Sequence, residues 1–191
     1  MPTCSLSRRT GEGQGEGRFV RNTPAVRHLF WQIPLVNSVL VICRCLKANE
    51  LMLRQSLQEL AISTRGRGFY ELTDEVRGLL RQTRFNTGLA TLHLRHTSAS
   101  LLIQENADPE VRRDFERFFA RLAPDGDPLF QHTCEGGDDM PAHVRTALTA
   151  VNLSIPIAGG ALALGTWQGI YLWEHRRQAH RRMVTVHFIG E

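Results

Sequence analysis

Hydrophobic and polar residues alternate in short segments separated by turn residues, and this pattern begins near Met52. Such alternation is typical of strands with one buried face. The strands predicted on this basis span residues 54–63, 89–104, 153–157, 162–164, 169–174 and 183–189. Gly159-Gly160 predicts a hairpin turn between the third and fourth of them. An Arg-rich turn predicts a second hairpin between the last two.

Apolar residues at helical spacing predict three helices, which begin near Thr73, Asp108 and Pro141. Thr and Asp cap helix N-termini well, and Pro109 suits the first turn of the second helix. The elements follow one another in the order β-α-β-β-α-α-β-β-β-β. This order predicts an α+β fold, a single compact domain with a mainly antiparallel sheet.

Residues 1–51 differ in character from the rest of the chain. Residues 1–28 are rich in Arg and Gly, a composition typical of disorder. Seven basic and three acidic residues give 1–51 a net charge of +4, whereas 52–191 carry sixteen of each and are neutral. We therefore expect 1–51 to be a disordered or non-native leader and 52–191 to be the folded domain, with Met52 as a natural start.

Composition excludes several classes of function. A neutral domain lacks the basic character expected of a nucleic-acid-binding protein, and no apolar run is long enough to span a membrane. Residues 52–191 contain no lysine, which excludes Schiff-base chemistry, while their arginines suit a bidentate grip on phosphate. Cys134 is the only cysteine of 52–191, so reduced thiols and a cytoplasmic location are expected.

Polar residues gather at four junctions between the predicted elements, in segments 96–100, 105–109, 132–143 and 165–177. His96 follows an apolar strand face and is expected to point inward, His143 begins a helix, and His175 closes a strand. We expect the three rings to converge on one pocket, because three histidines and a water are a common zinc arrangement. Core histidines and acidic helix caps are the structural alternatives for the same residues.

Taken together, the four segments resemble the YjbQ family, small proteins called secondary thiamine-phosphate synthases. The strings that carry the resemblance are His96-Thr97-Ser98-Ala99-Ser100, Glu105-Asn106-Ala107-Asp108-Pro109, Asp138-Asp139-Met140-Pro141-Ala142-His143 and Gly165-Thr166-Trp167-Gln168-Gly169-Ile170-Tyr171-Leu172-Trp173-Glu174-His175-Arg176. The resemblance covers 52–191 and implies a small α+β protomer that forms a homotrimer. It also implies an activity that joins an aminopyrimidine diphosphate to a thiazole phosphate and releases diphosphate.

The resemblance and the residue types together suggest a role for each candidate. The predicted metal ligands are His96, His143 and His175, for Mg²⁺ or Zn²⁺. The predicted catalytic residues are His96, Glu105, Asp139 and Glu174, with Asp138 close by. The predicted contacts to a phosphorylated small-molecule substrate are Ser98, Asn106, Trp167, Gln168 and Arg176.

Two other classes of function are compatible with these residues. A non-catalytic trimeric protein that binds a metabolite or an anion would need arginines and backbone N–H groups, but no spare carboxylates. A structural trimer with relict polar residues is the weaker alternative. The histidines beside carboxylates favour an enzyme.

A chain that begins at Met52 is expected to keep the thermal stability of the full chain, because the charge split and the onset of periodicity both place the domain edge there. Melting temperatures of the two chains, measured by circular dichroism, test this. A large drop on truncation would show that 1–51 contribute to the fold.

Overall fold

A computed structural model describes residues 52–191, and the predicted leader 1–51 lies outside the described residues. The strands are β1 (Arg54–Ser63), β2 (Gly68–Glu71), β3 (Thr87–Leu94), β4 (Ala99–Glu105), β5 (Asn152–Ala158), β6 (Ala161–Leu162), β7 (Gln168–Glu174) and β8 (Arg181–Gly190). The helices are α1 (Thr73–Thr83), α2 (Pro109–Leu122) and α3 (Asp139–Leu148). Within this part of the chain, none of the helices has the length and apolar character needed to cross a bilayer.

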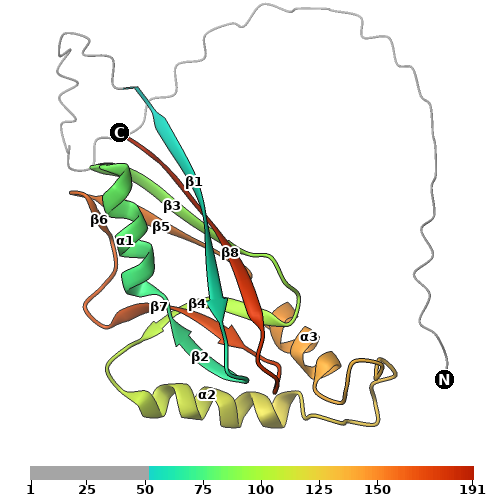
Figure 1. The fold of residues 1–191 in the computed structure, drawn as a ribbon. Helices are drawn as coiled ribbons and strands as arrows, with labels where there is room; N and C mark the ends of the chain where they lie inside the picture. Colours follow the sequence, from blue (N-terminus) through green and yellow to red (C-terminus); the bar gives the residue numbers. More distant parts are fainter. Residues whose placement is uncertain (1–51) are drawn as a thin grey trace, which may run out of the picture. The chain divides into compact units, whose positions relative to one another are not determined.

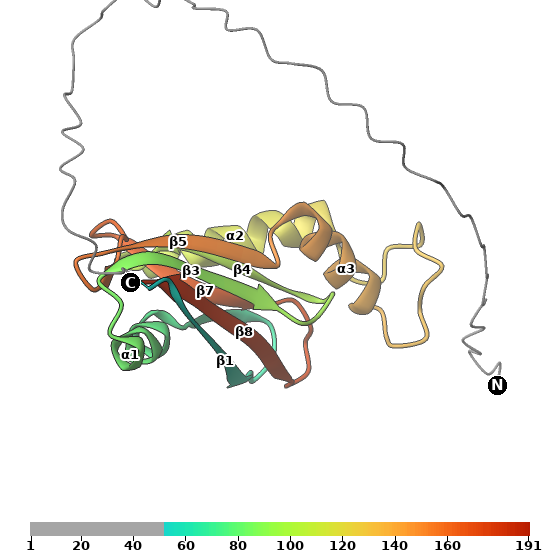
Figure 2. The same cartoon turned by 90° about the horizontal axis from the view of Figure 1, so that it is seen from above.

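The strands form two antiparallel sheets, which confirms the predicted α+β class. The larger sheet has the order β1-β8-β3-β5-β6, and the smaller has the order β2-β7-β4. Alternate residues of β3, β8, β4 and β7 point into one shared hydrophobic cluster, which includes Leu92, Val186, Leu101 and Leu172. The smaller sheet therefore packs against the larger one, and α1 closes an edge of this core (Figures 1 and 2).

The opposite face of the smaller sheet is covered by α2 (Figure 1). Trp173 lies on this face, stacked on Phe69 with ring centroids 4.7 Å apart and met edge-on by Phe119 of α2 at 4.8 Å. The α2 helix begins as predicted, because the Asp108 side chain accepts a hydrogen bond from the Glu110 N–H at 2.8 Å. Successive residues of β7 thus face either the core or α2.

Two predicted strand assignments are wrong. The predicted strand 89–104 is not continuous, because β3 ends at Leu94 and β4 begins at Ala99 in the other sheet. The two strands agree with the order of elements, which places two strands before the second helix. His96 lies in the bend between them and is exposed, so it does not point inward. The predicted hairpin of 169–174 with 183–189 does not form either, since β7 and β8 belong to different sheets. Alternation indicates which face a residue occupies, but not which strand is its partner.

Two helix starts also differ from the predictions. Thr73 is the first residue of α1 rather than its cap, and the N-cap position at Leu72 makes no side-chain capping bond. The α3 helix begins at Asp139, before the predicted start at Pro141. The earlier start of α3 places Asp139 and His143 one helical turn apart.

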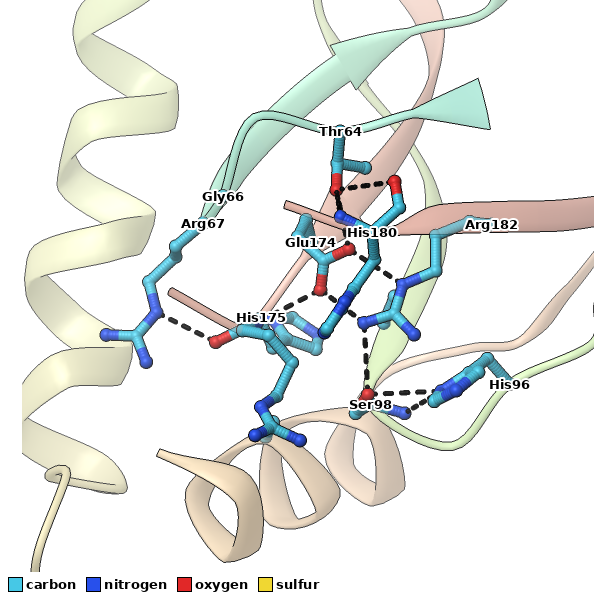
Figure 3. A network of polar contacts seen from close by, with 12 residues as sticks. Thr64, Gly66, Arg67, His96, Ser98, Glu174, His175, His180 and Arg182 are labelled. Carbon is cyan, nitrogen blue, oxygen red and sulfur yellow. Dashed lines mark hydrogen bonds and ion pairs between the residues drawn. The ribbon is translucent and has the colours of Figure 1, made fainter. Parts of the chain in front are cut away.

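A buried ion pair connects the two sheets (Figure 3). Glu174, at the end of β7, is fully buried and accepts two hydrogen bonds from the Arg182 guanidinium of β8, at 2.6 and 2.7 Å. The Thr64 hydroxyl and the Arg176 N–H donate to the same carboxylate at 3.1 and 3.0 Å. A buried charge needs such partners because desolvation is costly. Glu174 was predicted to be catalytic, and the structure places it inside, away from solvent.

His175 points to the other face of β7 and is also fully buried. Its Nε2 lies 2.7 Å from the Ser100 hydroxyl, its ring meets Trp173 edge-on, and its Nδ1 has no hydrogen-bond partner among residues 52–191. Burial, together with the positive charges of Arg145, Arg67 and Arg182, lowers the pKa of His175 to about 3. His175 is therefore a neutral core residue.

Replacing Glu174 with Gln should lower the free energy of unfolding by about 3–5 kcal/mol, because it leaves the Arg182 charge buried without its partner. Urea denaturation measures this loss. The double variant Glu174→Gln/Arg182→Met should regain part of it, since both buried charges are then gone. Glu59→Gln is the matched control, because it breaks an exposed pair with Arg95 and should cost less than about 1 kcal/mol. Equal losses in Glu174→Gln and Glu59→Gln would contradict the prediction.

The lowered pKa of His175 should make the fold less stable in acid. Between about pH 6.5 and about pH 3 the unfolded chain binds a proton at this ring and the folded chain does not, so stability falls as the pH falls. We expect the unfolding free energy of the wild type to drop by about 1.4 kcal/mol per pH unit more than that of His175→Gln. Denaturation at several pH values compares the two slopes. Equal slopes, or a His175 ring that titrates near neutral pH by NMR, would refute the assignment.

Candidate functional site

The bend between β3 and β4 meets the first turn of α3. The His143 Nδ1 lies 2.9 Å from the Thr97 carbonyl oxygen. A carbonyl can only accept a hydrogen bond, so Nδ1 carries the proton and donates it. The Nε2 of neutral His143 then keeps its lone pair, and this lone pair faces Asp139 at 3.4 Å.

Asp139 is the buried centre of this cluster, with a side chain only 2% exposed. Its Oδ2 lies 2.8 Å from the His132 Nε2 and its Oδ1 pairs with Arg176. Ligand atoms of His132, Asp139 and His143 all lie within 4.8 Å of one another. We call these three residues the His132–Asp139–His143 centre. Two imidazoles and a carboxylate form a donor set that catalytic zinc uses.

Arg176 anchors the acidic loop that carries this centre. Its guanidinium contacts Asp139, donates to the Asp138 carboxylate at 3.1 Å and donates to the Glu135 carbonyl at 2.6 Å. Burial alone would raise the pKa of Asp138, but the hydrogen bonds from the Arg177 N–H and from Arg176 outweigh it and lower that pKa. Arg176 was predicted to contact substrate, and in the structure each of its three guanidinium nitrogens already donates within the chain.

A chain of hydrogen bonds leads from the buried ion pair to the surface (Figure 3). Arg182 donates to the Ser98 hydroxyl at 3.1 Å, and the same oxygen lies 3.1 Å from the His96 Nδ1. Partial burial and the charge of Arg182 lower the pKa of His96, while the charge of Glu174 opposes them. His96 therefore stays neutral near pH 7 and shares the surface next to Thr97 with His143.

A hollow of about 450 Å³ lies beside His96. It is lined by residues from the end of β3, the bend, α3 and the segment just before β5: His93, Leu94, Arg95, His96, Thr97, Thr146 and Val151. The lining combines basic groups with apolar side chains. Such a hollow suits an anionic ligand that also has an apolar part.

Four predicted site residues lie elsewhere. In the pairing of β4 with β7, Ala99 lies opposite Glu174 at one end, and Glu105 lies opposite Gln168 at the other. The two ends of the pair are about 20 Å apart. Glu105 and Gln168 line a second hollow of about 380 Å³ together with Trp167, which is 64% exposed. Asn106 adjoins this hollow, because its N–H donates to the Trp167 carbonyl at 3.0 Å. Within one chain these residues do not join the histidines.

The structure brings His143 together with Asp138, Asp139 and Arg176, as the acidic segment suggested. His96 lies near these residues but outside the set of ligand atoms, and His175 lies in the core. His132 and Arg182 were not among the predicted site residues. His132 stands in the same polar segment as Asp139, so its position was a usable signal. The role of Arg182 had no local signal, since its partner Glu174 belongs to the other sheet.

The chain matches a family of proteins along most of the described residues. Residues 58–191 match the family model described as UPF0047 protein YjbQ-like. A UPF0047 protein from Synechocystis is 49% identical over 138 residues, covering 72% of this chain and 94% of that protein. UPF0047 protein YjbQ from Escherichia coli O157:H7 is 44% identical over 133 residues, covering 69% and 96%.

Solved structures agree with this match. The crystal structure of a conserved hypothetical protein from Thermus thermophilus has a TM-score of 0.61 at 36% identity, covering 68% of this chain and 97% of that one. A YbjQ-like protein of unknown function from Sulfolobus solfataricus has a TM-score of 0.67 at 20% identity, covering 73% and 100%, a likeness of fold. The predicted family is thus confirmed, and the chain belongs to the YjbQ-like UPF0047 proteins.

Proposed function

We propose that this chain is an enzyme that acts on phosphorylated small molecules at a divalent-metal centre, as a thiamine-phosphate-synthase-like transferase. The proposal rests on the His132–Asp139–His143 centre. There the Thr97 carbonyl turns the lone pair of His143 toward the carboxylate of Asp139. Two electron-rich atoms that face each other need a proton or a metal ion between them. Two imidazoles in the set favour Zn²⁺ over Mg²⁺, which prefers oxygen ligands.

The surroundings of the centre suit a reaction that releases diphosphate. A bound divalent cation would supply positive charge against the charge of the departing group. The chain's own residues hold the centre in position: Thr97 orients His143, and Arg176 fixes Asp139. The basic hollow beside His96 would hold the rest of the substrate. In the proposed reaction the aminopyrimidine carbon leaves its diphosphate oxygen and bonds to the thiazole nitrogen.

The same proposal includes a homotrimer in the cytoplasm. The outer face of α2 supports an assembly, because Phe118 and Leu122 are 61% and 51% exposed there. Exposed aromatic and aliphatic side chains on one helix face are typical of an interaction surface. A neighbouring subunit could also bring the Trp167 hollow of one chain close to the centre of another.

A trimeric metabolite- or anion-binding protein without catalysis is the alternative. The N–H groups of Arg95 and His96 in the lining of the hollow favour this function as much as they favour catalysis. The two functions differ in the centre, because simple anion binding does not require the Asp139 carboxylate. Metal content and metal dependence of turnover therefore separate them.

The full chain, purified without a histidine tag or a chelator, is expected to retain zinc, measured by inductively coupled plasma mass spectrometry. His143→Ala should bind zinc at least about 100-fold more weakly in calorimetry, because it removes a ligand. Its circular dichroism should be unchanged, since His143 is partly exposed. Release of diphosphate from the aminopyrimidine diphosphate should fall in parallel.

His187→Ala is the matched control, because it removes a histidine of β8 whose ring contacts only Gln55 among the hydrogen-bond partners in 52–191. It should keep the zinc affinity of the wild type. A wild-type chain that neither retains nor binds zinc would refute the metal centre. Binding of zinc without any turnover would favour the binding-protein alternative.

A further inference from the structure

His96 occupies a position where its hydrogen-bond partners determine which ring nitrogen carries the proton. The Ser98 N–H points at the His96 Nδ1, with a nitrogen–nitrogen distance of 3.2 Å. A backbone N–H can only donate, so the Nδ1 must accept. A neutral imidazole whose Nδ1 accepts carries its proton on Nε2.

The Ser98 hydroxyl reinforces this assignment. Arg182 donates to the Ser98 Oγ at 3.1 Å, and a guanidinium has no acceptor. The hydroxyl proton of Ser98 is therefore free to point at the His96 Nδ1, 3.1 Å away (Figure 3). Arg182 itself is held by two hydrogen bonds to Glu174 and is 2% exposed. A rigid buried ion pair thus fixes the orientation of an exposed ring through Ser98.

His96 and His143 consequently present opposite groups to the same region. His143 donates from Nδ1 to the Thr97 carbonyl and offers a lone pair on Nε2. His96, the residue before Thr97, accepts at Nδ1 and offers an N–H on Nε2. If His96 bound a metal through Nε2, its proton would move to Nδ1 and face the Ser98 N–H, so two donors would oppose each other.

We propose that His96 is not a metal ligand but a hydrogen-bond donor, through Nε2–H, to an anionic oxygen of the phosphorylated ligand. Ser98, Arg182 and Glu174 are positioning residues for the His96 ring. The class of ligand rests on the proposed function, whereas the proton position rests on hydrogen bonds within the chain. Arg95 also lines the hollow beside His96, and because its exposed pair with Glu59 uses only one nitrogen of the guanidinium, the other nitrogens can donate to an anion.

The charges around His96 are compatible with a neutral donor. Partial burial and the charge of Arg182 lower the pKa of His96, while the charge of Glu174 opposes them. Both lowering effects favour the neutral imidazole in the free chain. A neutral donor can bind a phosphoryl oxygen without giving up its proton.

The proton position is testable without activity. Long-range ¹H–¹⁵N NMR spectra of the ¹⁵N-labelled full chain should show a protonated Nε2 and an unprotonated Nδ1 for His96. The His96 signals are assigned by their loss in His96→Gln. Ser98→Ala keeps the backbone N–H that faces Nδ1 and loses the hydroxyl, so it should shift the His96 Nδ1 signal and raise the share of the Nδ1-protonated tautomer without making it dominant. Ser154→Ala, a change at an exposed serine of β5, is the matched control and should leave the spectrum unchanged. A proton on the Nδ1 of wild-type His96, or an unchanged His96 spectrum in Ser98→Ala, would overturn the positioning role.

Inorganic phosphate and zinc test the donor role. His96→Ala should weaken phosphate binding about tenfold, as expected for loss of one hydrogen bond to a charged group. His96→Gln should restore most of this affinity, because its amide nitrogen can donate from a similar position. Neither variant should change zinc affinity. Phosphate affinity equal to wild type in His96→Ala would refute the donor, and a loss of zinc affinity as large as in His143→Ala would make His96 a ligand.

The donor role of His96 and the metal centre can fail independently of each other. If the chain binds no zinc, the metal centre fails, but the tautomer of His96 and its contribution to phosphate binding remain measurable. If zinc binds and removes the Nε2 proton of His96, the metal centre survives and the donor proposal fails.

Discussion

The ion pair between Glu174 and Arg182 is the interaction on which the rest of the structure depends. It joins the ends of β7 and β8, and so fixes the smaller sheet relative to the larger one. Hydrophobic contacts between sheets are not directional, whereas a bidentate pair allows one relative position. The same pair holds Ser98 on one side and the backbone of Arg176 on the other. The pair is therefore connected by hydrogen bonds to His96 through Ser98, and to the acidic loop through Arg176.

The sequence predicted the elements of the fold better than their pairing. The α+β class, the antiparallel sheets and the cap at Asp108 could all be derived from local patterns. The division of 89–104 into β3 and β4 could not, because no Gly or Pro marks the bend at 95–98. β2 was missed because its four residues are too short to show a period. The hairpin of β7 with β8 was predicted wrongly because the connection between them looks like a turn within one sheet, whereas it links the two sheets.

The candidate site was predictable where it is local in sequence. Asp139 and His143 stand four residues apart on α3, and His132 precedes them in the same loop, so this part of the chain already suggested an ion site. Two contributions are invisible in a sequence. One is the backbone carbonyl of Thr97, which orients His143, and the other is the burial of His175 beside Trp173 and Ser100. His175 was predicted as a ligand because it closes a strand, and the packing around it places it in the core instead.

The chain passes between its two sheets three times at one end, through 64–67, 95–98 and 175–180. The last two connections hold polar residues of the site, and both are tied down, because the Thr97 carbonyl accepts from His143 of α3 while Arg176 binds the acidic loop. An inserted residue in either connection would rotate the following strand and turn its core face outward. Functional sequences with this fold should therefore carry no insertions or deletions in these two connections. The loop at 124–137 lies outside the sheets, and its exposed positions other than His132 can vary more freely.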